Sequence, residues 1–140
     1  MNGLPHRPRR NRKSQAIREM LRETQIQTQD LIYPFFMEDG SNKKIEISSM
    51  PGIHRWSLDL LLKEVEECME LGIKSFVLFP HVDDSLKDKT ASHSWAEDNY
   101  YLKAIRSLKE RFPEAILMSD VAMDPYSSDG HDGVVENGEI

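Results

Sequence analysis

Cysteine and long apolar runs are the scarcest features of this 140-residue chain. The only cysteine, Cys68, has no disulfide partner within the chain, and its place in a helical pattern predicts a core or boundary residue. No stretch approaches the roughly 18 apolar residues of a membrane span. The N-terminus is basic but lacks the apolar segment of a signal peptide. These absences predict a cytoplasmic protein that does not cross a membrane.

Several enzyme motifs are also missing. The phosphate-binding loops GxGxxG and GxxxxGK[ST] do not occur, which disfavours nucleotide binding. Ser127 and Ser128 do not stand in a nucleophile elbow. No lysine lies at an apolar strand end, where a Schiff-base lysine of low pKa would be expected.

Charge is distributed unevenly along the chain, whose net charge is -6. The segment from residue 119 to 140 contains acidic residues and neither lysine nor arginine. The first thirteen residues contain only basic charges, at Arg7, Arg9, Arg10, Arg12 and Lys13. No basic helix face or aromatic platform accompanies them, so nucleic acid is not the favoured partner. Attraction between the basic arm and an acidic tail of a neighbouring subunit is the alternative.

The hydrophobic pattern predicts alternating strands and helices. Apolar runs predict strands at residues 31–37, 73–80 and 115–121, with a bulge or a missing ladder bond at Pro34. Helical spacing predicts helices at 14–24, 57–71 and 96–111, capped by Ser14 and Ser57, with Gly72 ending the second. Residues 38–56 are predicted to be loop. The two tryptophans, Trp56 and Trp95, are predicted to pack.

This order of elements predicts an α/β fold with a parallel sheet covered by helices. Strands without polar alternation fit either the start of a (β/α)8 barrel or part of a doubly wound sheet. A closed barrel typically needs about 250 residues, so this chain could contain only its first units.

The segment from Asp120 to Gly133 directly follows the third predicted strand and concentrates the polar chemistry. Asp120 is placed to act as a general acid or base, or to orient a ligand amine, because active sites of parallel barrels lie at the carboxyl ends of the strands. The alternative for Asp120 is a helix cap or a loop salt bridge.

Metal binding by the same segment is a second possibility to weigh. Its oxygen ligands would suit a hard cation such as Mg²⁺ or Ca²⁺ better than Zn²⁺. The EF-hand pattern fails because Ser128 and Gly130 occupy two ligand positions. A different metal site and a solvated acidic loop both remain open. The candidate ligands are Asp124, Asp129, His131 and Asp132. The remaining histidines, including His54, His81 and His93, are predicted to be surface or capping residues.

Segments throughout the chain resemble the porphobilinogen synthase family, also called 5-aminolevulinate dehydratase. The most specific is Asp120 to Gly133, which resembles that family's metal loop. The others are Leu31 to Phe36, Ser49 to Gly52, Leu71 to Ile73, Lys87-Asp88 and Phe112-Pro113. The resemblance implies condensation of two 5-aminolevulinate molecules to porphobilinogen, a step towards haem. It also implies the first three βα units of a (β/α)8 TIM barrel at residues 30–140. Residues 1–29 would be an arm with a short helix that embraces a neighbour in a homo-oligomer, usually an octamer.

The resemblance also assigns roles within the loop. Asp120 matches the family's active-site aspartate. Zinc-dependent members have cysteines where this chain has Ala122, Asp124 and Asp132, so zinc is not expected. The chain resembles the aspartate-rich type associated with Mg²⁺, for which Asp124 and Asp132 are the metal candidates; these two could instead only hold the loop.

The family's two Schiff-base lysines lie on later strands, beyond Ile140. We therefore expect the 140-residue chain alone to be inactive and, because its sheet would be open, prone to associate. Two alternatives are a non-catalytic module that assembles with intact subunits and a small metal-binding protein.

Overall fold

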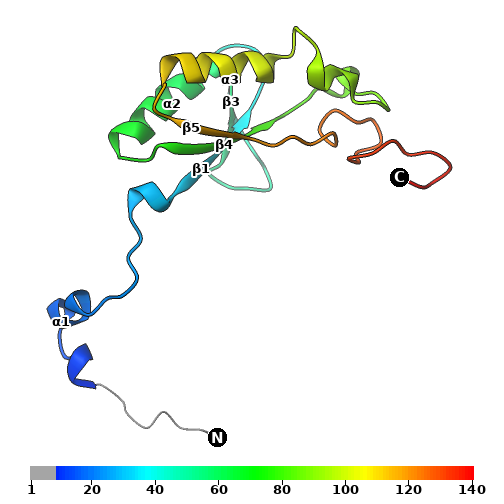
Figure 1. The fold of residues 1–140 in the computed structure, drawn as a ribbon. Coiled ribbons are helices and arrows are strands. Elements are labelled where there is room, and N and C mark those ends of the chain that lie inside the picture. Colours follow the sequence, from blue (N-terminus) through cyan, green and yellow to red (C-terminus); the bar gives the residue numbers. More distant parts are fainter. Residues whose placement is uncertain (1–8) are drawn as a thin grey trace, which may run out of the picture.

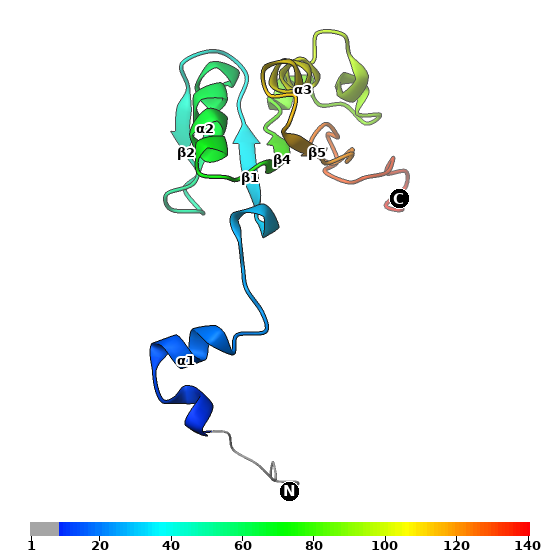
Figure 2. The ribbon, with the colours of Figure 1, turned by 60° about the vertical axis from the view of Figure 1, so that its left-hand side comes forward.

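A computed structural model describes residues 9–140. The N-terminal arm contains a 3-10 helix (η1, Arg9–Arg12), a short helix (α1, Gln15–Met20) and a second 3-10 helix (η2, Thr28–Asp30). Ser14 caps α1 as predicted, because its Oγ accepts a hydrogen bond from the Ile17 N–H at 3.2 Å. The helix ends earlier than residue 24. Residues 1–8 of the predicted arm, including Arg7, lie outside the described residues. Two views place α1 away from the sheet (Figures 1 and 2).

The sheet has five strands in the order β2-β3-β1-β4-β5. Strands β3, β1, β4 and β5 are parallel, and β2 is antiparallel to β3. The fold is therefore α/β with a mixed sheet. The strands are β1 (Ile32–Met37), β2 (Lys44–Glu46), β3 (His54–Trp56), β4 (Ser75–Pro80) and β5 (Ile116–Ser119).

The prediction of loop at residues 38–56 was wrong, since β2 and β3 lie there. Each is only three residues long. β2 is exposed throughout and β3 is half-buried, so neither strand shows the apolar pattern of a buried strand. Their ladder pairs Lys44 with Trp56, and the Lys44 ammonium lies 4.3 Å from the centre of the Trp56 ring. A cross-strand contact of this kind stabilises the pairing but leaves no periodicity in the sequence.

Pro34 lies in an unbroken part of the sheet. The register between β1 and β4 runs without a slip from Ile32↔Ser75 to Met37↔Pro80, so the alternative of a bulge was wrong. On its other side, β1 pairs with β3 only at Phe36 and Met37. Pro34 therefore has no ladder partner on that side, which is where a residue without an N–H is tolerated.

Helices α2 (Leu58–Glu70) and α3 (Tyr100–Arg111) cover one face of the sheet (Figure 1). Between them and the strands lies the main core, which includes Cys68 as predicted. The other members of this core that are buried on the strands and helices are Phe35, Met37, Leu61, Val65, Phe76, Leu78, Tyr101, Ala104 and Leu108.

Both ends of α2 match the sequence prediction in position. Gly72 has φ of +91° and its N–H donates to the Met69 carbonyl, while the Ile73 N–H donates to the Cys68 carbonyl. This pair of bonds is a Schellman motif, which needs the left-handed backbone that glycine adopts readily. Ser57 precedes the helix, but its hydroxyl bonds to Lys43 and Asp59 and does not cap the helix N–H groups.

Helix α3 begins at Tyr100, later than the predicted Ala96. Two short 3-10 helices precede it, η3 (Asp84–Leu86) and η4 (Ser92–Trp95), and Asn99 caps α3. Trp95 is 65% exposed, so its predicted packing was wrong. Strand β5 is also shorter than predicted and ends at Ser119.

The opposite face of the sheet is not covered by any helix in residues 9–140. Phe36 of β1 and Phe79 of β4 stack on this face with ring centroids 5.5 Å apart. Ile32 and Ile116 are more than half exposed. None of the helices in residues 9–140 has the length and apolar composition of a membrane span.

Candidate functional site

Loops after β1, β4 and β5 meet at one edge of the sheet. Because these three strands are parallel, their carboxyl ends face the same way. The loops comprise residues 38–43, 81–99 and 120–133, and the last two lie close together in Figure 1. We call residues 120–133 the acidic loop. The edge that the sequence predicted to hold the chemistry is therefore assembled from three separate parts of the chain.

Asp120 is the first residue after β5 and is exposed. Its carboxylate has no hydrogen-bond partner within the described residues. It lies near the buried Tyr101 hydroxyl, which donates to the Leu78 carbonyl at 2.8 Å. Burial raises the pKa of Tyr101 to about 12, with smaller contributions from Tyr126 and from the charge of Asp120. Asp120 is thus an exposed carboxylate at the carboxyl end of β5, where a ligand could contact it.

Asp132 folds the acidic loop back on itself. Its Oδ1 accepts hydrogen bonds from the N–H groups of Met123 at 2.8 Å and of Asp124 at 3.1 Å. Cation binding and support of the loop were the two alternatives for Asp132, and this geometry gives its Oδ1 the second role. The other oxygen, Oδ2, takes no hydrogen bond from the described residues.

Asp124 lies beside an open hollow of about 380 Å³. Lys87 also lines this hollow, and its ammonium forms an ion pair with Asp84 at 2.7 Å. Across residues 9–140, no group of three or more histidine, cysteine, aspartate or glutamate side chains is placed to hold a metal. Asp129 and His131 are exposed on the same loop. The roles of Asp124 and Asp132 as metal ligands stay predictions.

Tyr126 anchors the acidic loop to the rest of the molecule. It is 4% exposed and forms a small second core with Val82 and Ala91, against which Met123 packs. Its hydroxyl accepts a hydrogen bond from Nδ2 of Asn99 at 3.2 Å. Burial raises the pKa of Tyr126, because the phenolate would lose its hydration.

Asn99 is completely buried and links several elements. Its Oδ1 accepts from the Tyr101 N–H at 2.9 Å, which caps α3. Its Nδ2 also donates to the His93 carbonyl at 2.8 Å. Sequence reasoning missed this residue because it placed the helix start at Ala96. The signal was available, since asparagine is among the strongest N-cap residues.

Asp88 joins the loop after β4 to the acidic loop. Its N–H donates to the Tyr126 carbonyl at 3.2 Å, and its carbonyl accepts from the Ser128 N–H at 3.1 Å. Its carboxylate accepts from the N–H and hydroxyl groups of Thr90 and Ser92. These bonds, that from the Ser92 hydroxyl above all, hold the pKa of Asp88 well below its usual range. The spacing Asp-x-Thr-x-Ser is typical of such a side-chain-closed turn and could have been found from sequence.

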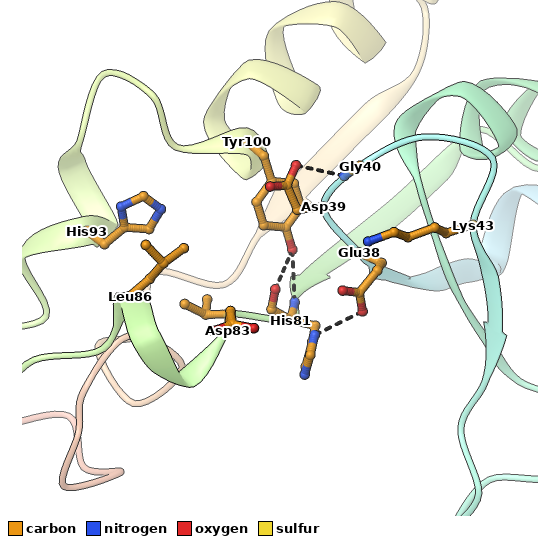
Figure 3. Close-up of a pocket in the computed structure, with 10 residues that line it drawn as sticks. Glu38, Asp39, Gly40, Lys43, His81, Asp83, Leu86, His93 and Tyr100 are labelled. Carbon is orange, nitrogen blue, oxygen red and sulfur yellow. Dashed lines mark hydrogen bonds and ion pairs between the residues drawn. The ribbon is translucent and has the colours of Figure 1, made fainter.

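A second hollow, of about 210 Å³, lies between the loops after β1 and β4 (Figure 3). His81 Nδ1 is 2.9 Å from Glu38 Oε2 there. The Tyr100 hydroxyl accepts from the His81 N–H at 3.0 Å and donates to the His81 carbonyl at 2.8 Å. Burial raises the pKa of Tyr100 far above its ordinary value. His81 therefore connects two strand ends, a role more specific than the surface or capping role predicted for it.

Comparison with known proteins identifies the family. The family model for delta-aminolevulinic acid dehydratase matches residues 5–140. The chain belongs to this family. It is 50% identical to the delta-aminolevulinic acid dehydratase of Chlamydia pneumoniae over 98% of this chain and 41% of that protein. It is 46% identical to that of Bradyrhizobium diazoefficiens, over 98% of this chain and 39% of that protein.

A solved structure of the dehydratase family has the same fold over most of this chain. It is the Toxoplasma gondii ME49 enzyme in complex with the reaction product porphobilinogen, with a TM-score of 0.86 and 48% identity. The match covers 96% of this chain and 38% of the Toxoplasma chain. This chain thus spans about two fifths of the length of these dehydratase relatives.

Proposed function

We propose that this chain is the amino-terminal part of a porphobilinogen synthase, which condenses two 5-aminolevulinate molecules to porphobilinogen in tetrapyrrole biosynthesis. The observation that carries the proposal is the structural similarity, over 96% of the chain, to a family member that contains porphobilinogen. The accessible Asp120 at the carboxyl end of β5 supports it, because that position suits contact with a substrate amine.

The fold supports a more specific proposal for the architecture. Residues 30–140 form the first three βα units of a (β/α)8 barrel, with α2 and α3 in its outer layer. The bare face with Phe36 and Phe79 would then line the barrel interior, where layers of side chains from further strands complete the packing. Residues 1–29 form the arm that joins subunits into a homo-oligomer, proposed to be an octamer. Met20 and Ile26, each more than 80% exposed, give the arm apolar surface for such a contact.

The donor atoms of the acidic loop suit Mg²⁺ and not Zn²⁺. The loop offers carboxylates at Asp124 and at Oδ2 of Asp132, while Ala122 offers no donor. Mg²⁺ commonly binds one or two carboxylates and keeps several waters, whereas zinc sites prefer thiolate and imidazole. A cation bound there would stabilise negative charge near the substrate. Within the chain itself, the Asp120 carboxylate would accept a proton or a hydrogen bond from the substrate amine and so orient it. Asp132 would keep Asp124 in place.

Split-enzyme reconstitution tests the proposed activity. The 140-residue chain is mixed with the part of the Chlamydia pneumoniae relative that lies beyond its matched segment, and porphobilinogen formation from 5-aminolevulinate is followed colorimetrically. We expect product from the pair and none from this chain alone, because the Schiff-base lysines would come from the second part. Asp120→Asn in this chain is expected to lower the rate by about 100-fold or more, the usual contribution of a positioned acid or base.

The control is the relative's own matched segment combined with the same second part. If that control forms product and the pair with this chain does not, the proposed function is wrong. Product from the 140-residue chain alone would contradict its inactivity, and a normal rate with Asp120→Asn would contradict the role of Asp120.

The same assay tests the cation. After chelation, activity of the pair should return with Mg²⁺ and not with Zn²⁺. Asp132→Asn keeps an oxygen for the Met123 and Asp124 N–H groups but removes the charge, whereas Asp132→Ala removes both. Loss of Mg²⁺ activation with both variants would support ligation by Asp132. Normal Mg²⁺ activation with Asp132→Asn, and loss only with Asp132→Ala, would show that Asp132 acts on the loop alone.

A further inference from the structure

The acidic loop lies outside the sheet, and the segment after β4 holds it in place. The loop leaves β5 after Ser119 and forms no ladder with a named strand. Its main contacts to other parts of residues 9–140 go to residues 81–99. They are the packing of Tyr126 on Val82 and Ala91, the Asn99–Tyr126 hydrogen bond, and the two main-chain bonds to Asp88.

The Asp88 side chain determines the course of the segment that makes these contacts. Its carboxylate closes a turn by accepting from both the N–H and the hydroxyl of Thr90 and of Ser92. Inside this turn, Ala91 is fully buried and has φ of +53°, a left-handed conformation that an alanine rarely adopts. Closure of the turn therefore holds Ala91 under Tyr126 and presents the Asp88 main chain to Tyr126 and Ser128.

We propose that Asp88 is a positioning residue, whose side chain sets the place of the acidic loop through the main-chain bridge between Asp88 and residues 126–128. It touches no reacting group itself. It acts through the acidic loop, which carries both Asp120 and Asp124. The importance of that loop for catalysis rests on the proposed function, but the structural coupling does not.

Residue-specific amide hydrogen exchange of the 140-residue chain, measured by NMR, tests the coupling without any assay of activity. In Asp88→Ala, we expect the Ser128 amide to exchange about tenfold faster or more, since several hydrogen bonds to a charged group are lost together. Exchange at Phe76 and Leu78 in β4 should change by less than about twofold, because local opening does not require unfolding of the sheet.

Two further variants separate positioning from a general loss of stability. Asp88→Asn keeps an acceptor for Thr90 and Ser92 and should retain most of the protection at Ser128. Lys89→Ala alters the exposed neighbouring residue and should leave exchange unchanged. Should Asp88→Ala not fold, Thr90→Val and Ser92→Ala each remove one hydroxyl donor and should each accelerate exchange at Ser128 to a smaller extent.

Unchanged exchange at Ser128 in Asp88→Ala, or in both hydroxyl variants if that variant does not fold, would overturn the proposal. Equal acceleration at Ser128 and in β4 would also overturn it, since that pattern reports global unfolding. Neither result would bear on the proposed activity, which the reconstitution assay tests separately.

Discussion

Replacement of Asn99 tests whether one buried amide stabilises the loop region, as the structure indicates. Asn99→Ala removes the cap of α3, which is typically worth about 1 kcal/mol. It also removes one of the two hydrogen bonds to the His93 carbonyl, which keeps the Ala96 N–H, and leaves the buried Tyr126 hydroxyl without its Asn99 donor, a loss of about 1–3 kcal/mol. We therefore expect the free energy of unfolding to fall by about 2–4 kcal/mol, a large part of the total stability of a typical domain.

Asn99→Ser divides this effect into its two parts. Serine caps helices about as well as asparagine but is too short to reach the His93 carbonyl and Tyr126. It should therefore cost about 1 kcal/mol less than alanine. Asp98→Ala, at the exposed neighbouring position, serves as the control and should change the stability by less than about 0.5 kcal/mol.

Urea denaturation followed by circular dichroism at low protein concentration measures these differences. The midpoint should shift while the m-value stays constant, because the surface exposed on unfolding is the same. A loss below about 1 kcal/mol for Asn99→Ala would refute the reasoning from buried hydrogen bonds. Equal losses for alanine and serine would show that the helix cap contributes nothing.

Two further predictions concern a glycine and a tyrosine. Gly72→Ala should destabilise the protein by about 2–3 kcal/mol, against about 1 kcal/mol for Gly52→Ala, in thermal or urea melts. Both have positive φ, but only at Gly72 would the new Cβ meet another group, the Thr28 Oγ1 at 2.9 Å; equal losses would contradict this contact. Tyr101 should ionise only near pH 12 in a spectrophotometric titration. Since its folded pKa is raised above the unfolded value of 10.0, its contribution to stability is complete below pH 10 and is lost as the pH rises to about 12. Ionisation near pH 10 in the folded protein would contradict its burial.

The sequence predicts those parts of the fold that depend on local chemistry and apolar periodicity. The stripe of α2 is recognisable from Leu61 and Val65, and its end from Gly72. The three strands β1, β4 and β5 follow from apolar runs in the sequence. The short strands β2 and β3 could not be found in this way, because their three-residue ladder is stabilised by tertiary contacts such as Lys44 with Trp56.

The candidate site was predicted in location but not in construction. Ligand contact by Asp120 and metal binding by Asp124 and Asp132 stay predictions, whereas the loop contact that Asp132 forms was one of its two predicted alternatives. The turn that Asp88 closes on Thr90 and Ser92 and the cap that Asn99 forms on α3 are local and could have been found from the sequence, but the contacts of both residues with the acidic loop are far away in the sequence. Such partners are determined by how the loops after β4 and β5 pack together, which neither residue indicates alone.

The uncovered face of the sheet, with its stacked Phe36 and Phe79, has a kinetic consequence. The opposite face of the sheet is covered by α2 and α3 of the same chain. Formation of the core between them is therefore a first-order process, whose rate constant does not depend on protein concentration. Association of two molecules through their uncovered sheet faces is a second-order process, because its rate depends on the concentrations of both. Tenfold dilution therefore leaves the folding rate of each molecule unchanged and slows its loss by association tenfold, so the yield of the folded monomer is determined by concentration as well as by stability.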